Sequence, residues 1–207
     1  MCNLYTLKAE RWEIDAYFQA NDVWRREIEN TPNYAAEVYP GYPGLVLVEG
    51  VLQTMNWGFP LPQKSKKTGN PIKPKAVNNA RTDKLGTPFW KSSFEHRRCL
   101  IPVTAFAEAE GEAGSMTRTW ISRPDAPIFA CAAIWRNSEE WGEVYSMVMT
   151  DPCDATACVH DRMPVMLREE DQKRWVEGSP AEAFELCVPW AGEVTIERTD
   201  VPWVARR

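Results

Sequence analysis

The sequence has no long apolar run, no glycine-rich phosphate loop and only two histidines, His96 and His160. No uninterrupted apolar stretch approaches the roughly 20 residues that cross a bilayer. The first residues also lack the basic segment and apolar stretch of a secretory signal. These absences argue against a membrane-spanning or secreted protein and predict a cytoplasmic one with no membrane partner. The missing phosphate loop argues against a P-loop nucleotide hydrolase.

Cysteine and histidine do not occur at the spacings of common metal sites. The best candidate is Cys153-x4-Cys158-x-His160, which matches no usual zinc pattern and has no evident fourth ligand. We therefore predict neither a metal nor another cofactor. In a reducing cytosol most of the six cysteines are expected as free thiols. Cys99 and Cys131 lie in apolar strand-like runs and are expected in the core.

The composition is that of a folded globular chain. Hydrophobic residues make up 44% and charged residues 26% of the sequence. A length of 207 residues suffices for one domain with a large core. Because we find neither an internal repeat nor a linker, residues 1–207 are interpreted as one domain, which we expect to be a monomer.

Strand-like segments outnumber helical ones. Helices are predicted over residues 7–19, with Thr6 as the N-cap, and over 89–96, 169–177 and 180–187. Strands are predicted over residues 34–39, 45–49, 51–59, 99–101, 105–110, 116–122, 128–135, 143–150 and 194–198. Turn residues suggest a hairpin between the first two strands, and the lysine-rich stretch up to Lys75 is interpreted as an exposed loop. The pattern predicts an α+β protein in which antiparallel β-sheets form a barrel-like core with peripheral helices.

Positive charge is concentrated in one segment of an acidic chain. Residues 62–98 hold ten basic and two acidic residues, a net charge of +8, which leaves −13 for the rest of a chain whose total is −5. A focused basic region on an acidic protein is typical of a phosphate-binding face. The alternative is a solvated segment whose lysines only aid solubility.

Cys2 gains a distinct chemistry if Met1 is removed. Its amine and thiol then lie on adjacent carbons. The amine can condense with an aldehyde to an imine, and the thiol can close on the same carbon to a five-membered thiazolidine. The amine has an ordinary pKa of roughly 7.7–8.0 and the thiol one of ~8.5, so both are close to their reactive forms at neutral pH. The alternative is that a cysteine at position 2 has no special role.

Three further residues are candidates for proton transfer or positioning. His160 lies in Val-His-Asp-Arg-Met-Pro-Val, a charged and rigid loop suited to a proton-transferring imidazole. Glu108 stands among apolar residues on a predicted strand, where burial would raise its pKa. Asn79 precedes Arg81, which is able to clamp a phosphate. The alternatives without a functional role are a structural histidine, a solvent-facing glutamate and a turn asparagine followed by a surface arginine.

Several motifs occur together and in a fixed order. They are Cys2 after Met1, Trp57-Gly58, Asn79-Ala80-Arg81, Arg98 to Pro102 leading to Glu108, and His160-Asp161-Arg162-Met163-Pro164. In this combination the chain resembles the SOS response-associated peptidase (SRAP) family over residues 2–167. The asparagine and histidine motifs are the most specific of the set.

The resemblance implies a single SRAP domain that covalently captures abasic sites in single-stranded DNA. It implies Cys2 as the nucleophile, Asn79 as its positioning residue, Glu108 as the acid or base beside the amine, and His160 as the group that acts on the sugar. The residues expected to contact DNA or line its channel are Arg81, Trp57, Thr150, Arg162 and Lys84. Single-stranded DNA containing abasic sites is thus the expected partner, and a role in the DNA damage response follows.

The sequence also departs from the family pattern. The usual Cys-Gly-Arg start is here Cys2-Asn3-Leu4, so an arginine expected to contact phosphate is missing. The aromatic neighbours of the glutamate are replaced by Ala107 and Ala109. The loss of these aromatic neighbours puts the family's preference for a DNA junction in doubt.

Two other classes of function remain open at the level of sequence. Cys2, Asn79, Glu108 and His160 are also the groups of an N-terminal cysteine peptidase that acts on its own leader or on a peptide. A lyase side activity is compatible with the same groups. A plain DNA- or protein-binding module would instead need none of this chemistry.

Overall fold

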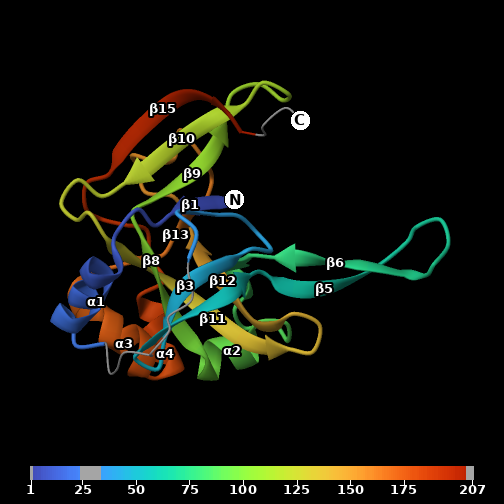
Figure 1. Ribbon diagram of the computed structural model, residues 1–207, viewed down its shortest axis with the longest axis horizontal. Coiled ribbons are helices and arrows are strands. Elements are labelled where there is room, and N and C mark those ends of the chain that lie inside the picture. The colour runs from blue at the N-terminus through green and yellow to red at the C-terminus, as the bar shows by residue number, and fades with distance from the viewer. Residues whose placement is uncertain (1, 24–33, 204–207) are drawn as a thin grey trace.

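A closed ring of five strands forms the centre of the fold (Figure 1). The computed structural model describes residues 2–23 and 34–203. The ring strands are β3 (Pro43–Val48), β4 (Val51–Trp57), β8 (Arg98–Val103), β11 (Phe129–Ser138) and β12 (Gly142–Thr150). In the order β12–β4–β3–β8–β11 and back to β12, only the β4–β12 pair is parallel. The predicted barrel-like core is therefore confirmed.

A second sheet lies beside the barrel and carries the N-terminal residues of the described chain. Its order is β15–β10–β9–β1–β2. The strands are β1 (Leu4–Thr6), β2 (Glu37–Val38), β9 (Ala105–Glu110), β10 (Thr117–Ser122) and β15 (Thr195–Pro202). Three short strands pair with the ends of the barrel strands β11 and β12: β7 (Asn79–Arg81), β13 (Met163–Pro164) and β14 (Met166–Leu167). β1 thereby lies near the junction between the second sheet and the barrel (Figure 1).

The helices are short and peripheral, as predicted. They are α1 (Arg11–Ala20), α2 (Lys91–His96), α3 (Gln172–Glu177) and α4 (Pro180–Glu185), with 3-10 turns η1 (Thr82–Lys84) and η2 (Glu169–Asp171). Figure 1 shows α2, α3 and α4 at the end of the barrel that faces away from the second sheet. In the described part of the chain no helix is both long and apolar enough to cross a membrane.

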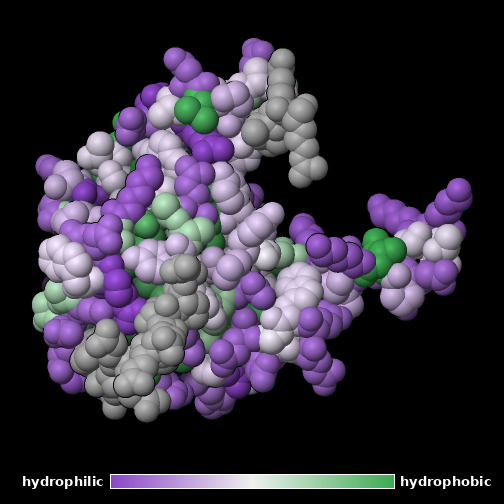
Figure 2. Space-filling model, viewed as in Figure 1, coloured by the Kyte–Doolittle hydropathy of each residue, from purple (hydrophilic) through white to green (hydrophobic). Residues whose placement is uncertain are grey.

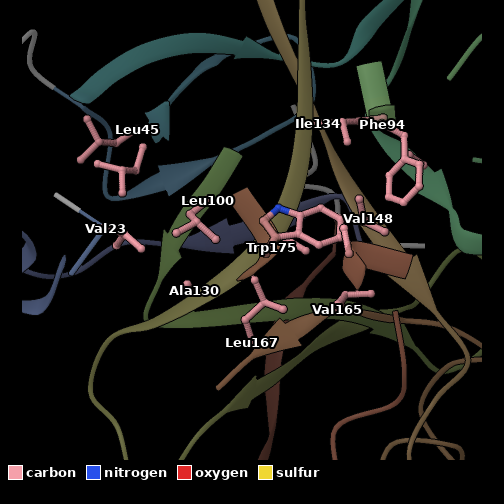
Figure 3. Close-up of a cluster of buried hydrophobic side chains, with 14 of the residues drawn as sticks. Val23, Leu45, Phe94, Leu100, Ala130, Ile134, Val148, Val165, Leu167 and Trp175 are labelled. Carbon is pink, nitrogen blue, oxygen red and sulfur yellow. The ribbon is translucent and has the colours of Figure 1, made fainter. Parts of the chain in front are cut away.

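The barrel strands separate two hydrophobic clusters because side chains alternate between the faces of a strand. Leu100 and Ala130 belong to the cluster that also contains Trp175 and other helix residues (Figure 3). Cys99 and Cys131 belong to the other cluster, which contains residues of the second sheet and Cys2. Both cysteines are 0% exposed, which confirms their predicted place in the core.

A glycine makes room for two buried hydroxyls inside this second cluster. The Tyr5 and Tyr145 hydroxyl oxygens are 2.5 Å apart and share a hydrogen bond. A Cβ built on Gly44 would collide with both oxygens. The hydroxyl pair and the β3 backbone therefore occupy space that only glycine leaves free.

We expect Gly44→Ala to destabilise the protein by about 2–4 kcal/mol, since it adds overpacking to the loss of a buried hydrogen bond. Urea unfolding measures the change. Gly86→Ala is the matched control, because a Cβ there meets nothing within 4 Å and should change the free energy of unfolding by less than about 0.5 kcal/mol. Equal free energies for the two variants would contradict this account of Gly44.

The predicted start of the first helix, with Thr6 as its N-cap, is wrong. The first helix begins at Arg11, where Glu10 and Glu13 form a capping box, and not after Thr6. Thr6 lies in β1, and its hydroxyl contacts that of Thr104 at 3.0 Å. Strand pairing across the sheets thus overrides a local capping signal.

Two predicted connections are also wrong. Residues 34–39 and 45–49 do not form a hairpin: β2 pairs with β1, and β3 pairs with β4 across Glu49 and Gly50. The lysine-rich stretch is not a loop but an antiparallel hairpin of β5 (Phe59–Lys64) and β6 (Pro71–Val77). The hairpin projects from the body of the molecule (Figure 1).

Candidate active site around Cys2

Cys2 is fully buried and lies just before β1. Residues next to the barrel strands fix its position. Its carbonyl oxygen accepts hydrogen bonds from the side-chain amides of Asn78 at 2.9 Å and Asn79 at 2.7 Å. Its thiol donates to the Leu4 carbonyl oxygen at 3.5 Å. Met1 lies outside the described residues. Asn79 begins β7, which pairs in parallel with β12, so a barrel strand fixes the position of Cys2.

Asn79 keeps one polar atom available. Its Oδ1 is buried and has no hydrogen-bond partner among the described residues. An acceptor in that state is costly unless a donor is supplied by a bound group. Because its Nδ2 already binds Cys2, the Asn79 side chain bridges the nucleophile and any such group.

Asn78, which binds Cys2, was not predicted from the sequence. Trp57, which was expected to line the DNA channel, lies in the core instead. Trp57 is 0% exposed, so in this conformation it offers DNA no surface to stack on. Its indole N–H donates to the Asn78 carbonyl oxygen at 2.9 Å, and its ring lies edge-on to Tyr5 at 5.0 Å. The role of Trp57 is therefore to support Asn78 from the core. The Asn78-Asn79 repeat was the available sequence signal.

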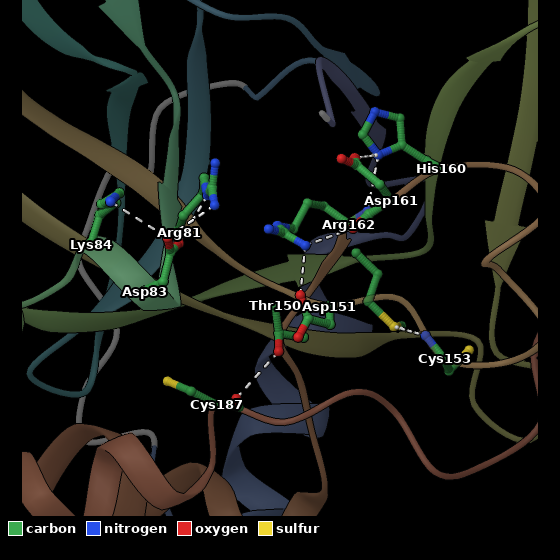
Figure 4. A network of polar contacts seen from close by, with 11 residues as sticks. Arg81, Asp83, Lys84, Thr150, Asp151, Cys153, His160, Asp161, Arg162 and Cys187 are labelled. Atoms are coloured by element: carbon green, nitrogen blue, oxygen red, sulfur yellow. Dashed lines mark hydrogen bonds and ion pairs between the residues drawn. The ribbon is translucent and has the colours of Figure 1, made fainter.

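Glu108 and His160 lie together across the gap between β9 and the loop that follows β12. Glu108 is 2% exposed, and its Oε2 is 3.9 Å from His160 Nε2. His160 Nδ1 accepts from the Arg162 backbone N–H at 3.1 Å and lies 2.9 Å from the Asp161 carboxylate. When the ring is neutral, Nε2 therefore carries the proton and lies on the side of Glu108. When the ring is protonated, the Asp161 carboxylate, which Figure 4 shows against the ring, stabilises the positive charge.

Burial sets the protonation of the site. Burial, with a smaller contribution from the Asp161 charge, raises the pKa of Glu108 to about 7. Burial lowers the pKa of His160. Burial and the Glu108 charge both raise the pKa of the Cys2 thiol. Near neutral pH the thiol is therefore protonated, the imidazole is largely neutral, and Glu108 exchanges a proton readily.

The raised pKa of Glu108 makes stability depend on pH. The unfolded carboxyl loses its proton near pH 4.5 and the folded one near pH 7, so the folded state holds the extra proton between these values. Stability should therefore fall as pH rises through this window, by up to about 3 kcal/mol. Glu108→Gln removes this loss, so its advantage over wild type should grow from pH 4 to pH 8 in urea unfolding. The exposed Glu112→Gln is the control; identical pH dependence in both variants would contradict the assignment.

The cations expected to contact DNA are held by exposed carboxylates. Arg81 pairs with both oxygens of Asp83 at 2.9 Å, and Lys84 lies 3.7 Å from the same group. Arg162 pairs with Asp151 at 2.5 Å (Figure 4). These arrangements keep cations on the surface near the site, where a phosphate is able to replace the carboxylate.

Thr150 has almost no exposed surface to offer DNA. It is 3% exposed, and its hydroxyl donates to the Cys187 carbonyl oxygen at 3.3 Å. Figure 4 shows it beside Asp151, below the Arg162–Asp151 pair. The structure thus gives Thr150 a role in fixing the end of β12 rather than in lining a channel.

The basic segment is not one continuous face. Arg98 is 9% exposed, and its guanidinium donates to the carbonyl oxygens of Phe94, Trp175 and Gly178, so it joins β8 to the helices. The lysines at 64–75 instead lie on the projecting hairpin. Within residues 2–23 and 34–203 no cluster of three or more His, Cys, Asp or Glu side chains is arranged to hold a metal.

Comparison with known proteins agrees with the motifs. The family described as SOS response associated peptidase (SRAP) matches residues 1–202. "Abasic site processing protein YoqW" of Bacillus subtilis is 28% identical over 187 residues, covering 85% of this chain and 80% of that protein. "Abasic site processing protein YoaM" of the same organism is 24% identical and covers 92% of this chain and 86% of that protein.

The fold is also found in solved structures. A crystal structure of a protein from Bacteroides thetaiotaomicron superposes with a TM-score of 0.74 at 20% identity, covering 95% of this chain and 91% of that one. A second, from Bordetella bronchiseptica, gives a TM-score of 0.72 at 19% identity and covers 96% of this chain and 99% of that one. With the family match extending over nearly all of the sequence, the chain belongs to the SOS response-associated peptidase family.

Proposed function

We propose that this protein binds single-stranded DNA and captures abasic sites covalently, through Cys2, as a thiazolidine. The observation that carries the proposal is the placement of Cys2. Its carbonyl oxygen accepts hydrogen bonds from Asn78 and Asn79, and the charge of Glu108 raises the pKa of its thiol. The names of the Bacillus relatives, abasic site processing proteins, support a lesion of this kind as the target.

The reaction begins with cleavage of the bond after Met1, which frees the Cys2 amine. An abasic deoxyribose is mostly a closed hemiacetal, and opening it requires a proton on the ring oxygen. His160 donates a proton to the ring oxygen, and the proton of the C1′ hydroxyl passes to Glu108, which lies 3.9 Å from His160, so the ring opens to the aldehyde. The neutral amine then attacks C1′, and loss of one water gives the imine.

The thiol closes the ring in the second step. Because burial and the Glu108 charge keep the Cys2 thiol protonated, it does not compete with the amine for the aldehyde. Once the imine is protonated, its positive charge favours the thiolate beside it. The sulfur adds to C1′ and the nitrogen becomes a secondary amine, so no oxidant or further leaving group is needed. Holding amine, thiol and aldehyde together supplies the advantage of proximity.

DNA binding in this proposal requires no base-specific contact, because the missing base is the target. Arg81, Lys84 and Arg162 exchange their carboxylate partners for phosphates on either side of the lesion. Such binding is independent of sequence and weakens as salt rises. The buried Asn79 Oδ1 offers an acceptor for the sugar hydroxyl or for the Cys2 amine.

The direct test is a denaturing gel. Protein from which Met1 has been removed is incubated with a single-stranded oligonucleotide that contains one abasic site. The proposal predicts a band of protein–DNA adduct that survives denaturation and disappears on proteolysis. An oligonucleotide with a chemically reduced abasic site has no aldehyde and should give no band. Equal bands with both oligonucleotides, or none with either, would refute covalent capture through the aldehyde.

A cysteine peptidase receives less support from the same geometry. Nucleophilic cysteines are activated as thiolates beside a cationic or basic group. Here the Cys2 thiol binds the Leu4 carbonyl oxygen, its pKa is raised, and His160 lies against Glu108. Capture of an aldehyde, in contrast, begins with the amine and therefore does not require a preformed thiolate.

A further inference from the structure

A cavity of about 560 Å³ lies beside Cys2 and has no part in the proposed reaction. Its lining comes from the second sheet and from the base of the β5–β6 hairpin, on either side of the hollow that Figure 2 shows between the projecting hairpin and the body. Asn3 and Asn78 line it, and the Asn78 side chain binds the Cys2 carbonyl oxygen. A group held in the cavity is thus separated from Cys2 by a single side chain. The volume is within the roughly 300–1,000 Å³ that is usual for ligand sites.

The walls of the cavity are largely apolar and aromatic. Tyr39 and Trp203 line it, and both are partly buried. The apolar part of the lining is Leu4, Pro40 and Ala76. Aromatic side chains of this kind are the platforms on which unpaired bases stack. No carboxylate is among the described residues that line the cavity. The walls therefore suit a flat, uncharged ring.

Arg118, on β10, supplies hydrogen-bond donors to the cavity. Its side chain is only 14% exposed. One terminal nitrogen donates to the Glu37 carboxylate at 3.4 Å and the other to the Tyr39 hydroxyl oxygen at 3.2 Å, both at or beyond the long end of the usual range. Its Nε is buried and has no hydrogen-bond partner among the described residues. Because arginine has five N–H donors, these two bonds leave the guanidinium with donors to spare.

The surroundings of Arg118 favour a base over a phosphate. The Glu37 carboxylate already offsets the charge of the guanidinium, so an anion gains less here than beside an unpaired arginine. A neutral base loses nothing by this pairing. Among the bases, guanine presents two adjacent acceptors, O6 and N7, and a bidentate contact to them is the commonest specific contact that arginine makes with DNA. Adenine places a donor beside its N7 acceptor and is a poorer match for a guanidinium.

We propose that this cavity holds the base of the nucleotide next to the lesion and prefers guanine, with the ring stacked on Tyr39 and Trp203 and with O6 and N7 bonded to Arg118. Lys75, exposed at the edge of the cavity, attracts the phosphate of the same nucleotide. This inference rests on the proposed function, because it takes the occupant to be part of the strand that reaches Cys2. It adds one base-dependent contact to the sequence-independent contacts with phosphate.

The test measures binding to single-stranded oligonucleotides that contain a tetrahydrofuran analogue of the abasic site. The analogue has no aldehyde, so nothing crosslinks and the covalent reaction does not enter the measurement. The base next to the analogue is guanine, adenine, cytosine or thymine, on the 5′ side in one series and on the 3′ side in another. On one of the two sides, wild type should bind guanine about tenfold more tightly than the other bases in fluorescence anisotropy. On the other side the four affinities should be equal within about twofold.

Modified bases and variants locate the contact. Hypoxanthine keeps O6 and N7 and should bind as guanine does, whereas 7-deazaguanine lacks N7 and should lose most of the preference. Arg118→Met should bind all four bases alike, and Arg118→Lys, which keeps a donor, should retain part of the preference. Arg174→Met is the matched control, because Arg174 is also paired with a glutamate but lies on α3. It should keep the full wild-type preference.

Each outcome decides the assignment. Equal affinity of wild type for the four bases on both sides would overturn it, as would a preference that survives in Arg118→Met. If Arg118→Met weakens binding to all four bases equally and lowers the slope of log affinity against log salt by about 0.7, Arg118 binds a phosphate and the base assignment fails. If Arg118→Met has a lowered thermal unfolding midpoint, the hypoxanthine and 7-deazaguanine results on wild type decide.

The adduct assay separates this inference from the proposed function. A wild type that prefers guanine beside the analogue, yet forms no adduct with a true abasic site, would refute covalent capture and support the base site. A wild type that forms the adduct but has no base preference would refute the base site alone.

Discussion

Cys2→Ala should form no DNA adduct that survives a denaturing gel, yet a borohydride reductant should restore one. Alanine at position 2 keeps the α-amine after removal of Met1, so the imine with the abasic aldehyde still forms. Without the thiol the imine has no ring to close and is hydrolysed. Hydride adds to the C=N bond and makes the link permanent. Wild type needs no reductant, because sulfur completes the thiazolidine.

This pair of measurements separates the contribution of the Cys2 amine from that of the Cys2 thiol. Retaining Met1 is the matched control, since it turns the Cys2 amine into an amide and leaves the thiol in place. It should give no adduct without reductant, because an imine formed on the Met1 amine has no neighbouring thiol that can close a five-membered ring. Noncovalent affinity for DNA should stay within about twofold in Cys2→Ala, because the side chain is buried and uncharged. A stable adduct formed by Cys2→Ala without reductant would contradict a role for the thiol.

Glu108→Gln should slow adduct formation by about 10²–10⁴-fold under single-turnover conditions, the usual contribution of a positioned acid or base. Glutamine keeps the shape of the side chain but cannot carry a proton between His160 and the amine. The wild-type rate should rise with pH through about 7 as Glu108 ionises, and again near the amine pKa of roughly 8. The variant should keep only the second rise.

Glu112→Gln is the control, because Glu112 lies at the exposed end of the β9–β10 hairpin. Its rate and its pH profile should match wild type. If Glu108→Gln keeps the inflection near pH 7, another group is the proton carrier. If its rate equals that of wild type, Glu108 has only a structural role.

The sequence predicted those parts of the fold that local pattern determines. β9 (Ala105–Glu110) was predicted with its exact bounds, and the buried cysteines were predicted from apolar runs. The β5–β6 hairpin was not predicted, because Pro62, Pro71 and Pro74 disrupt the alternation that identifies a strand. β1 was missed as well, since three residues carry little pattern and form a strand only because β9 and β2 lie on either side.

The residues proposed for the site remain predictions, and their geometry could not be predicted from the sequence. The structure brings Cys2 to Asn79, and Glu108 to His160, from segments that are far apart in the chain. No spacing rule predicts that Asn78 shares the carbonyl oxygen with Asn79, or that Trp57 faces the core. These facts depend on which strand edge meets the second sheet, and that contact is set by non-local pairing. Burial, which the sequence only suggested for Glu108, is what gives the carboxyl its raised pKa.

The most direct measurement of the central claim is the intact mass of the adduct, followed by sequencing of its N-terminal peptide. Protein without Met1 is incubated with a single-stranded abasic oligonucleotide and analysed without reduction. The account predicts a mass equal to that of protein plus DNA less one water molecule, with the modification at Cys2 and no free thiol at that residue. An adduct located at any lysine, or one in which the Cys2 thiol can still be alkylated, would contradict it.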